Sequence, residues 1–168
     1  MYPEMASSFD ASLKLSSLFK KEIEEIRKDK WVTMFNSGVV DAEQDSLEKA
    51  LEKFKMAIII DPRRYEAYLN AAAQTMKMDD CDQSMKFAEQ ANQINPDEIK
   101  VLNAQAQISF NCREYNKSLD VYRKLREMDP QNVNALINMA MIYELMHLPD
   151  SSKVVYDRII EIDPEYKD

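Results

Sequence analysis

Glycine is nearly missing from this chain, which has one glycine among 168 residues. Sheets and tight turns use glycine wherever the backbone must adopt a positive φ. The shortage therefore argues against strand-rich folds and favours nearly continuous helix. Histidine is equally scarce, and because His147 stands alone, the chain cannot supply a metal site built from several histidines.

Lysine and arginine are also in deficit, since 22 of them face 30 aspartates and glutamates for a formal net charge of −8. That balance opposes binding to a nucleic-acid backbone, which needs clustered basic side chains. The chain has no apolar run of about 18 residues that could span a membrane, and its first nine residues lack the layout of a signal peptide. We therefore expect a soluble protein, favour the cytoplasm, and leave open an exported form whose signal has been removed.

The two cysteines, Cys81 and Cys112, lack the CxxC or Cys/His spacing of metal sites. They fit two interpretations. One is a pair of small, partly buried free thiols. The other is a disulfide between turns of neighbouring segments, which would imply an oxidising compartment.

What the chain does contain is a fixed spacing. An aspartate or asparagine followed by proline recurs every 34 residues, at Asp61-Pro62, Asn95-Pro96, Asp129-Pro130 and Asp163-Pro164. Proline lacks an N–H and keeps the residue before it out of the α region, so each pair should end a helix at the same phase of a repeat. A period of this length predicts stacked helical units.

This period divides the chain into four units, at 31–64, 65–98, 99–132 and 133–166. Apolar residues spaced by three and four predict two helices in each unit. Their expected ranges are 31–43, 46–59, 65–77, 81–94, 99–111, 115–128, 133–145 and 150–162. Small residues recur at one phase of the first helix and one of the second, so neighbouring helices should pack closely. They are Gly38, Ala72, Ala106 and Ala140, then Ala50, Ser84, Ser118 and Ser152.

The pattern resembles the tetratricopeptide repeat, whose units have two helices, a bulky residue at position 4, a small one at position 8 and proline at position 32. The resemblance covers residues 31–166, and the bulky position holds Met34, Tyr68, Leu102 and Leu136. It implies an all-α fold, a right-handed superhelical solenoid of four helix-turn-helix units. Ahead of these units we expect a flexible lead-in at 1–8 and an amphipathic capping helix at 9–30.

The turns inside the units depart from the family, which usually has glycine there. The position is occupied by Asp45, Asp79, Arg113 and His147. Aspartate tolerates a left-handed backbone better than arginine, so the third and fourth turns are expected to be built differently. At helix starts, Asn132 and Asp150 are expected N-caps, and Asp80 with Gln83 matches a capping box.

The resemblance implies that the first helices of successive units line a concave groove. We predict that the partner-binding residues of this groove are Phe35, Val39, Leu69, Met76, Lys100, Asn103, Phe110, Ile137, Met141 and Glu144. In the alternative interpretation, neighbouring helices or the N-terminal segment cover these residues, because apolar helical stripes are more often core than binding site.

Chaperone-binding members of the family hold a peptide's terminal carboxylate with Lys, Asn, Asn, Lys and Arg spread over three units. In the register that begins at the first unit, Asn70 and Lys100 match that set, whereas Phe35, Val39 and Ala104 do not. Two matches of five do not make this clamp. No glycine-rich phosphate loop, nucleophile elbow or paired-histidine helix is present either, so we expect no enzyme activity, cofactor or metal.

The sequence therefore predicts a non-enzymatic adaptor that binds an apolar or amphipathic protein segment. The alternative is a self-assembling module, or a section of a larger solenoid, that works through its end faces. The last helix favours this alternative, because it has more apolar residues than one inner face requires. They are Val154, Val155, Ile159, Ile160 and Ile162. We expect a second copy, in a homodimer, or a further chain segment to cover this helix.

Overall fold

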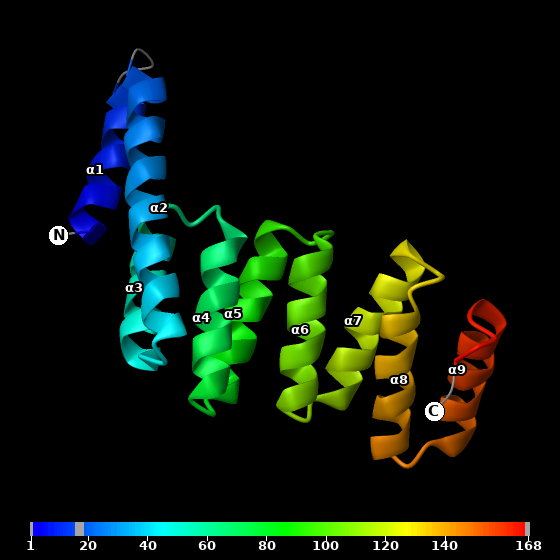
Figure 1. The fold of residues 1–168 in the computed structure, drawn as a ribbon. Coiled ribbons are helices and arrows are strands. Elements are labelled where there is room, and N and C mark those ends of the chain that lie inside the picture. The colour runs from blue at the N-terminus through cyan, green and yellow to red at the C-terminus, as the bar shows by residue number, and fades with distance from the viewer. Residues whose placement is uncertain (1, 16–18, 167–168) are drawn as a thin grey trace. The chain divides into compact units, whose positions relative to one another are not determined.

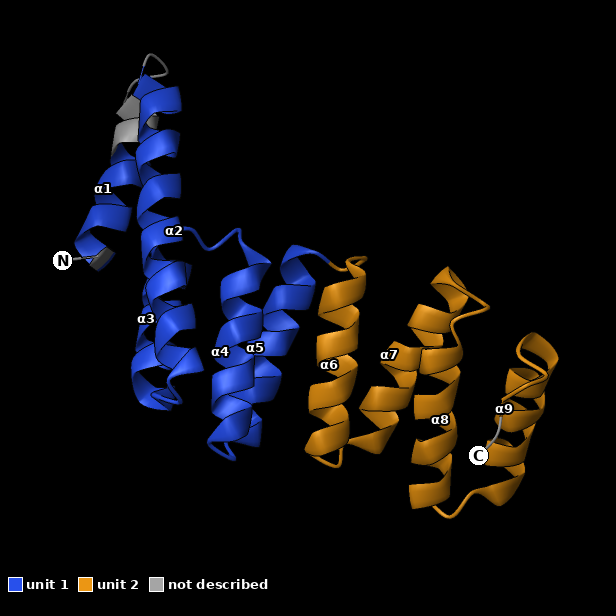
Figure 2. Ribbon diagram, viewed as in Figure 1, with its two compact units in different colours: residues 1–95 blue, residues 96–168 orange. Residues whose placement is uncertain are grey.

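The computed structural model describes residues 2–15 and 19–166, and over these ranges its regular elements are α-helices (Figure 1). They form two compact units, residues 1–95 and 96–168 (Figure 2). The first contains α1 (Tyr2–Leu15), α2 (Lys20–Glu43), α3 (Leu47–Ile60), α4 (Tyr65–Lys77) and α5 (Cys81–Ile94). The second contains α6 (Ile99–Asn111), α7 (Tyr115–Met128), α8 (Val133–Leu145) and α9 (Pro149–Ile162).

The all-α helical repeat fold is thus confirmed. From α3 onward, each helix begins and ends within one residue of its predicted position. Within the described ranges, no helix combines the length and the apolar character needed to cross a membrane.

The N-terminal lead-in expected at 1–8 differs from what the structure has, because α1 begins at Tyr2. Proline is compatible with this start, since the first turn of a helix leaves its N–H groups without partners in any case. The Ser8 hydroxyl donates to the Glu4 carbonyl at 2.8 Å, so it follows the helix rather than breaking it.

The expected capping helix at 9–30 crosses residues 16–18, which lie outside the described ranges. Beyond them, α2 runs unbroken from Lys20 to Glu43. The expected cap and the first helix of the first repeat are therefore one element on this side. No proline interrupts the sequence there, and the helix continues past the expected boundary at residue 30.

Packing of α1 against α2 depends on a buried arginine. Arg27 is 5% exposed, its Nη2 lies 2.7 Å from Asp10 Oδ1, and its guanidinium lies 5.7 Å from the centroid of the Phe9 ring. A buried charge needs such partners, because its desolvation would otherwise destabilise the fold. These contacts hold α1 against the first half of α2, and the capping role of this segment stays a prediction.

The aspartate or asparagine before each repeating proline ends its helix by leaving the α region, with φ between −130° and −141°. The carboxylates of Asp61, Asp129 and Asp163 also accept a hydrogen bond from the N–H two residues ahead. This Asx turn explains why a short acidic side chain precedes the proline.

The turn between the two helices has the same conformation in all four 34-residue repeats. The expectation that the third and fourth turns differ from the first two is therefore wrong. Asp45, Asp79, Arg113 and His147 have φ between 56° and 62°. In each turn the next residue's N–H donates to a carbonyl five residues back, as in the Schellman motif. These main-chain bonds are the same for any side chain, and they hold Arg113 and His147 in the left-handed region.

Two of the three expected helix starts are confirmed. Asn132 accepts the N–H three residues ahead at 3.0 Å, and Asp80 likewise accepts the Gln83 N–H at 3.0 Å. The Gln83 side-chain amide also donates to the Asp80 carboxylate rather than accepting from the Asp80 N–H, so Asp80 is an N-cap without the reciprocal bond of a capping box. Asp150 is not an N-cap, because α9 already begins at Pro149, whose fixed φ suits the first helical position.

The small residues lie where the two helices of a repeat meet, and all of them are buried. The Ser84 hydroxyl donates to the Ala72 carbonyl at 2.8 Å, and Ser118 donates to Ala106 at the same distance. The second helix therefore approaches the backbone of the first closely enough to hydrogen-bond it. Ser152 differs, because it donates to the carboxylate of Glu144 at 3.3 Å.

The free-thiol interpretation of the cysteines is wrong. Cys81 begins α5 and Cys112 follows α6, and both are disulfide-bonded. Neither sulfur is available as a thiolate nucleophile or metal ligand.

Candidate functional site

All ten predicted groove residues lie on the first helices of the repeats. Four belong to the first compact unit and define what we call the unit 1 face, namely Phe35, Val39, Leu69 and Met76. Six belong to the second and define the unit 2 face, namely Lys100, Asn103, Phe110, Ile137, Met141 and Glu144. Each of the ten is at least partly exposed.

The unit 1 face combines packing with exposure. Phe35 stacks on Trp31 with ring centroids 4.6 Å apart and lies 5.6 Å from the Phe54 ring, so part of it belongs to the core. Val39 packs against the same core, whereas Leu69 and Met76 on α4 are half-buried. Neighbouring helices therefore cover part of Phe35 and Val39 on α2, as the alternative interpretation of the groove residues expects.

On the unit 2 face, exposure increases along α8. Phe110 and Ile137 pack against the core of this unit, and the Phe110 ring lies 6.0 Å from that of Tyr115. Met141 is 42% exposed. On this face, Phe110 and Ile137 are therefore partly buried, and the apolar surface continues along α8 to the exposed Met141.

Sequence reasoning missed two further apolar residues near this continuation. Leu145 follows Met141 by one turn of α8 and is 49% exposed, and Leu148 in the next turn is 42% exposed. A signal for them was present, because Glu144 is the single charged residue among the 13 of α8. A helix that is apolar all round is normally buried on all sides, and α8 is not.

Several polar side chains on the same helices form hydrogen bonds within the repeat. Asn70 and Asn138 each donate to the carbonyl four residues earlier, at 2.9 Å. Glu144 accepts from Ser152, whereas the Lys100 side chain is exposed. Asn70 is one of the two matches to the carboxylate clamp, and its amide is already engaged.

A charged cluster lies at the turn between α3 and α4. Asp61, 4% exposed, accepts from Arg63 Nε at 2.7 Å and Arg64 Nε at 3.3 Å, and Arg63 also reaches Glu24 at 2.7 Å. Burial raises the pKa of Asp61, but the hydrogen bonds from Arg63 and Arg64 outweigh it and leave the pKa below its usual 3.8. Arg64 lies over the Trp31 ring at 4.5 Å. The cluster is internally paired and ties α2 to this turn.

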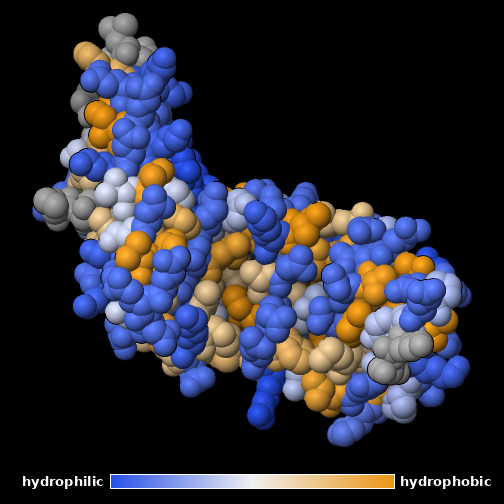
Figure 3. Space-filling model, in the orientation of Figure 1, coloured by the Kyte–Doolittle hydropathy of each residue, from blue (hydrophilic) through white to orange (hydrophobic). Residues whose placement is uncertain are grey.

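The surface seen in Figure 3 carries apolar patches among hydrophilic side chains in both units. Over residues 2–15 and 19–166, no group of three or more His, Cys, Asp or Glu side chains is arranged to hold a metal ion. What the site offers chemically is apolar contact area with scattered polar groups.

Residues 133–166 match the family model of the tetratricopeptide repeat. Among curated relatives, anaphase-promoting complex subunit 3 of Schizosaccharomyces pombe is 26% identical over 121 residues, which cover 72% of this chain and 18% of that protein. Hsp70-Hsp90 organizing protein 1 of Glycine max is 29% identical over 93 residues, covering 55% of this chain and 16% of that protein. The chain thus spans less than a fifth of these relatives.

Solved structures share the fold at lower identity. MamA superimposes with a TM-score of 0.72 at 16% identity, covering 86% of this chain and 85% of that chain. YrrB, described as having an unusual peptide-binding site, gives 0.69 at 15% identity and covers 98% and 86%. The first repeat domain of Spaghetti (RPAP3), bound to the HSP90 peptide SRMEEVD, gives 0.65 at 15% identity and covers 71% and 94%.

Proposed function

This chain is a tetratricopeptide repeat protein, and on that premise we propose that it is a non-enzymatic scaffold that binds an apolar or amphipathic segment of a partner protein. Proteins of this kind generally mediate protein–protein interactions. The binding residues in our proposal are those of the unit 1 and unit 2 faces.

The observation that carries the proposal is the exposure of α8. Ile137, Met141 and Leu145 follow one another at intervals of four residues, so they lie on one side of the helix. They span about 12 Å along the helix axis at 1.5 Å per residue. An amphipathic helix with apolar residues at matching intervals could cover this stripe. Methionine adapts its shape to irregular partners, which suits such a surface.

The charge on the faces also favours this class of partner. Lys100 and Glu144 are the charged members of the ten, and they have opposite signs. A strongly charged peptide tail would find no matching cluster there, whereas an apolar segment would bury little unpaired charge.

The proposal is tested by two methionine variants. Met141→Glu adds a charge to the exposed stripe on α8, and Met128→Glu adds the same charge on α7 at a residue of similar exposure, 43%. We expect proteins captured by wild type from a lysate of the source organism to be lost with Met141→Glu and kept with Met128→Glu, as measured by quantitative mass spectrometry. Equal capture by both variants would contradict the proposal. Phe110→Glu is less suitable, because Phe110 packs against the core.

Self-association through α9 is a second candidate, favoured by the exposure of Ile160 at 51%. A homodimer would bury this side chain. Sedimentation of wild type and Ile160→Glu over a range of concentrations tests it. A mass that rises for wild type and stays monomeric for the variant is the expected result, and a constant monomer mass for wild type would contradict it.

A further inference from the structure

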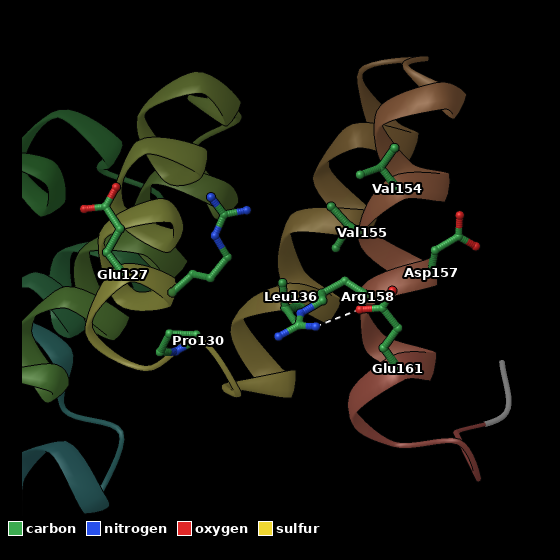
Figure 4. A pocket seen from close by; sticks show the side chains of 9 residues that line it. Glu127, Pro130, Leu136, Val154, Val155, Asp157, Arg158 and Glu161 are labelled. Atoms are coloured by element: carbon green, nitrogen blue, oxygen red, sulfur yellow. Dashed lines mark hydrogen bonds and ion pairs between the residues drawn. The ribbon is translucent and has the colours of Figure 1, made fainter.

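A hollow of about 640 Å³ lies within the second unit (Figure 4), and none of the residues that line it is among the ten predicted binding residues. The second helices α7 and α9 form its walls, and α8 contributes one residue. It is lined by Arg126, Glu127, Pro130, Leu136, Val154, Val155, Asp157, Arg158 and Glu161. This volume lies inside the range of about 300–1,000 Å³ that is typical of ligand pockets.

Two of the equivalent positions in the first unit, two repeat lengths earlier, hold larger side chains. Phe87 stands in place of Val155, Tyr68 in place of Leu136, and Ile58 in place of Arg126. Phe87 and Ile58 pack against the core of their unit. Valine and leucine in place of the Phe87 and Tyr68 rings leave more room in the second unit, where the hollow measures about 640 Å³ against about 260 Å³ for the one beside Phe87.

The apolar part of the lining comes mainly from α8 and α9. Leu136 and Val155 are buried, at 1% and 6% exposed, whereas Val154 is 69% exposed. In Figure 4, Val154 and Val155 point from α9 toward the hollow. An apolar side chain entering here would cover Val154, which nothing in the described part of the unit covers.

The charged part of the lining is oriented unevenly. In Figure 4, Arg158 extends from α9 toward Leu136, while Asp157 and Glu127 point away from the hollow. Asp157 is paired with Lys153 at 3.3 Å, and Arg158 with Glu161 at 2.7 Å. Among the described residues, Arg126 has no carboxylate partner. The hollow therefore has one guanidinium that is neutralised and one that is not.

We propose that this hollow binds a peptide segment of a partner protein in which a bulky apolar side chain stands next to a carboxylate. The apolar side chain would lie on Leu136, Val154 and Val155, and Arg126 would pair with the carboxylate. The chain's net charge of −8 does not prevent this, because solvent screens exposed charges beyond about 8 Å. This site is independent of the proposed binding on the first helices.

The test starts from a random peptide display library, selected on wild type and counter-selected on the double variant Arg126→Ile, Val155→Phe. That variant places at the hollow the residues that the first unit has at the same positions, so it should fold, which circular dichroism checks. We expect enriched peptides to carry Asp or Glu beside Phe, Leu or Trp. A selection that enriches no peptide, or peptides without an acidic residue, overturns the proposal.

Affinities of an enriched peptide, measured by fluorescence anisotropy, assign the residues. We expect a loss of about tenfold or more for the double variant and for Arg126→Gln, which is the scale of a charge-assisted hydrogen bond. Val154→Glu should lose as much through charge repulsion, and its side chain is too exposed for the change to unfold the protein. Met141→Glu should bind unchanged, which separates this site from the proposed function. Unchanged affinity of Val154→Glu overturns the proposal, as does a concentration-dependent dimer that the double variant abolishes, since a second copy would then be the occupant.

Discussion

At the scale of single residues, one contact explains the chain's only glycine. Gly38 lies on α2 opposite Phe54, which is fully buried in the core of the first unit. A Cβ at this position would lie 2.8 Å from Phe54 Cε1 and 3.1 Å from Lys53 Cβ. The other three repeats have alanine at the equivalent position. Glycine is therefore required by the ring that faces it.

Gly38→Ala sets two effects of opposite sign against each other. Alanine favours the helix by about 1 kcal/mol over glycine. Overpacking against a buried ring costs about 1–3 kcal/mol, so we expect a net loss of stability of about 1 kcal/mol, measured by urea denaturation.

A double-mutant cycle checks the cause of that loss. Phe54→Leu makes room for the added methyl group, so Gly38→Ala should cost less in the Phe54→Leu background than in wild type. A higher urea midpoint for Gly38→Ala alone would show that the ring yields to the new methyl group and that propensity dominates.

At the scale of elements, the turn between α3 and α4 depends on an ionised Asp61. Because hydrogen bonds lower its folded pKa below the usual 3.8, Asp61 stabilises the fold above that pH. The contribution is lost as the pH falls through the folded pKa. We expect Asp61→Asn to cost about 2 kcal/mol at neutral pH, and the difference from wild type to shrink below about pH 4.

Asp129→Asn is the matched control, because Asp129 forms the same Asx turn at an exposed position. It should change stability little at any pH. Urea denaturation of the three proteins between neutral pH and acid makes the comparison. A pH-independent gap between wild type and Asp61→Asn would contradict the role assigned to the charge.

The elements also show what the sequence could predict and why the rest escaped. Proline spacing determines where the second helix of each repeat ends, and apolar periodicity gives the other boundaries, so the sequence predicts seven helices to within a residue. Arg113 and His147 were misjudged because side-chain preference was weighed without the main-chain bonds that impose the turn. Leu145 was missed because family positions guided the choice of groove residues. The hollow beside Val155 depends on packing between helices, which no local pattern reports.

At the scale of the whole molecule, two surfaces on different helices would allow two kinds of partner. The faces on the first helices are mostly apolar, whereas the hollow on the second helices joins apolar contact to an arginine. The fold is shared with proteins that bind peptides, but the side chains on these surfaces decide which peptides fit.

The HSP90 peptide SRMEEVD, bound by the Spaghetti (RPAP3) domain, provides the last test. Phe35, Val39 and Ala104 offer this chain no donor where a terminal carboxylate would need one, and Asn70 already bonds its own helix. We therefore expect no binding of labelled SRMEEVD in fluorescence anisotropy, under conditions in which the RPAP3 domain binds it. Binding that Lys100→Ala then abolishes would contradict this expectation, because it would mean that Lys100, the other residue that matches the clamp, holds the carboxylate without the rest of it.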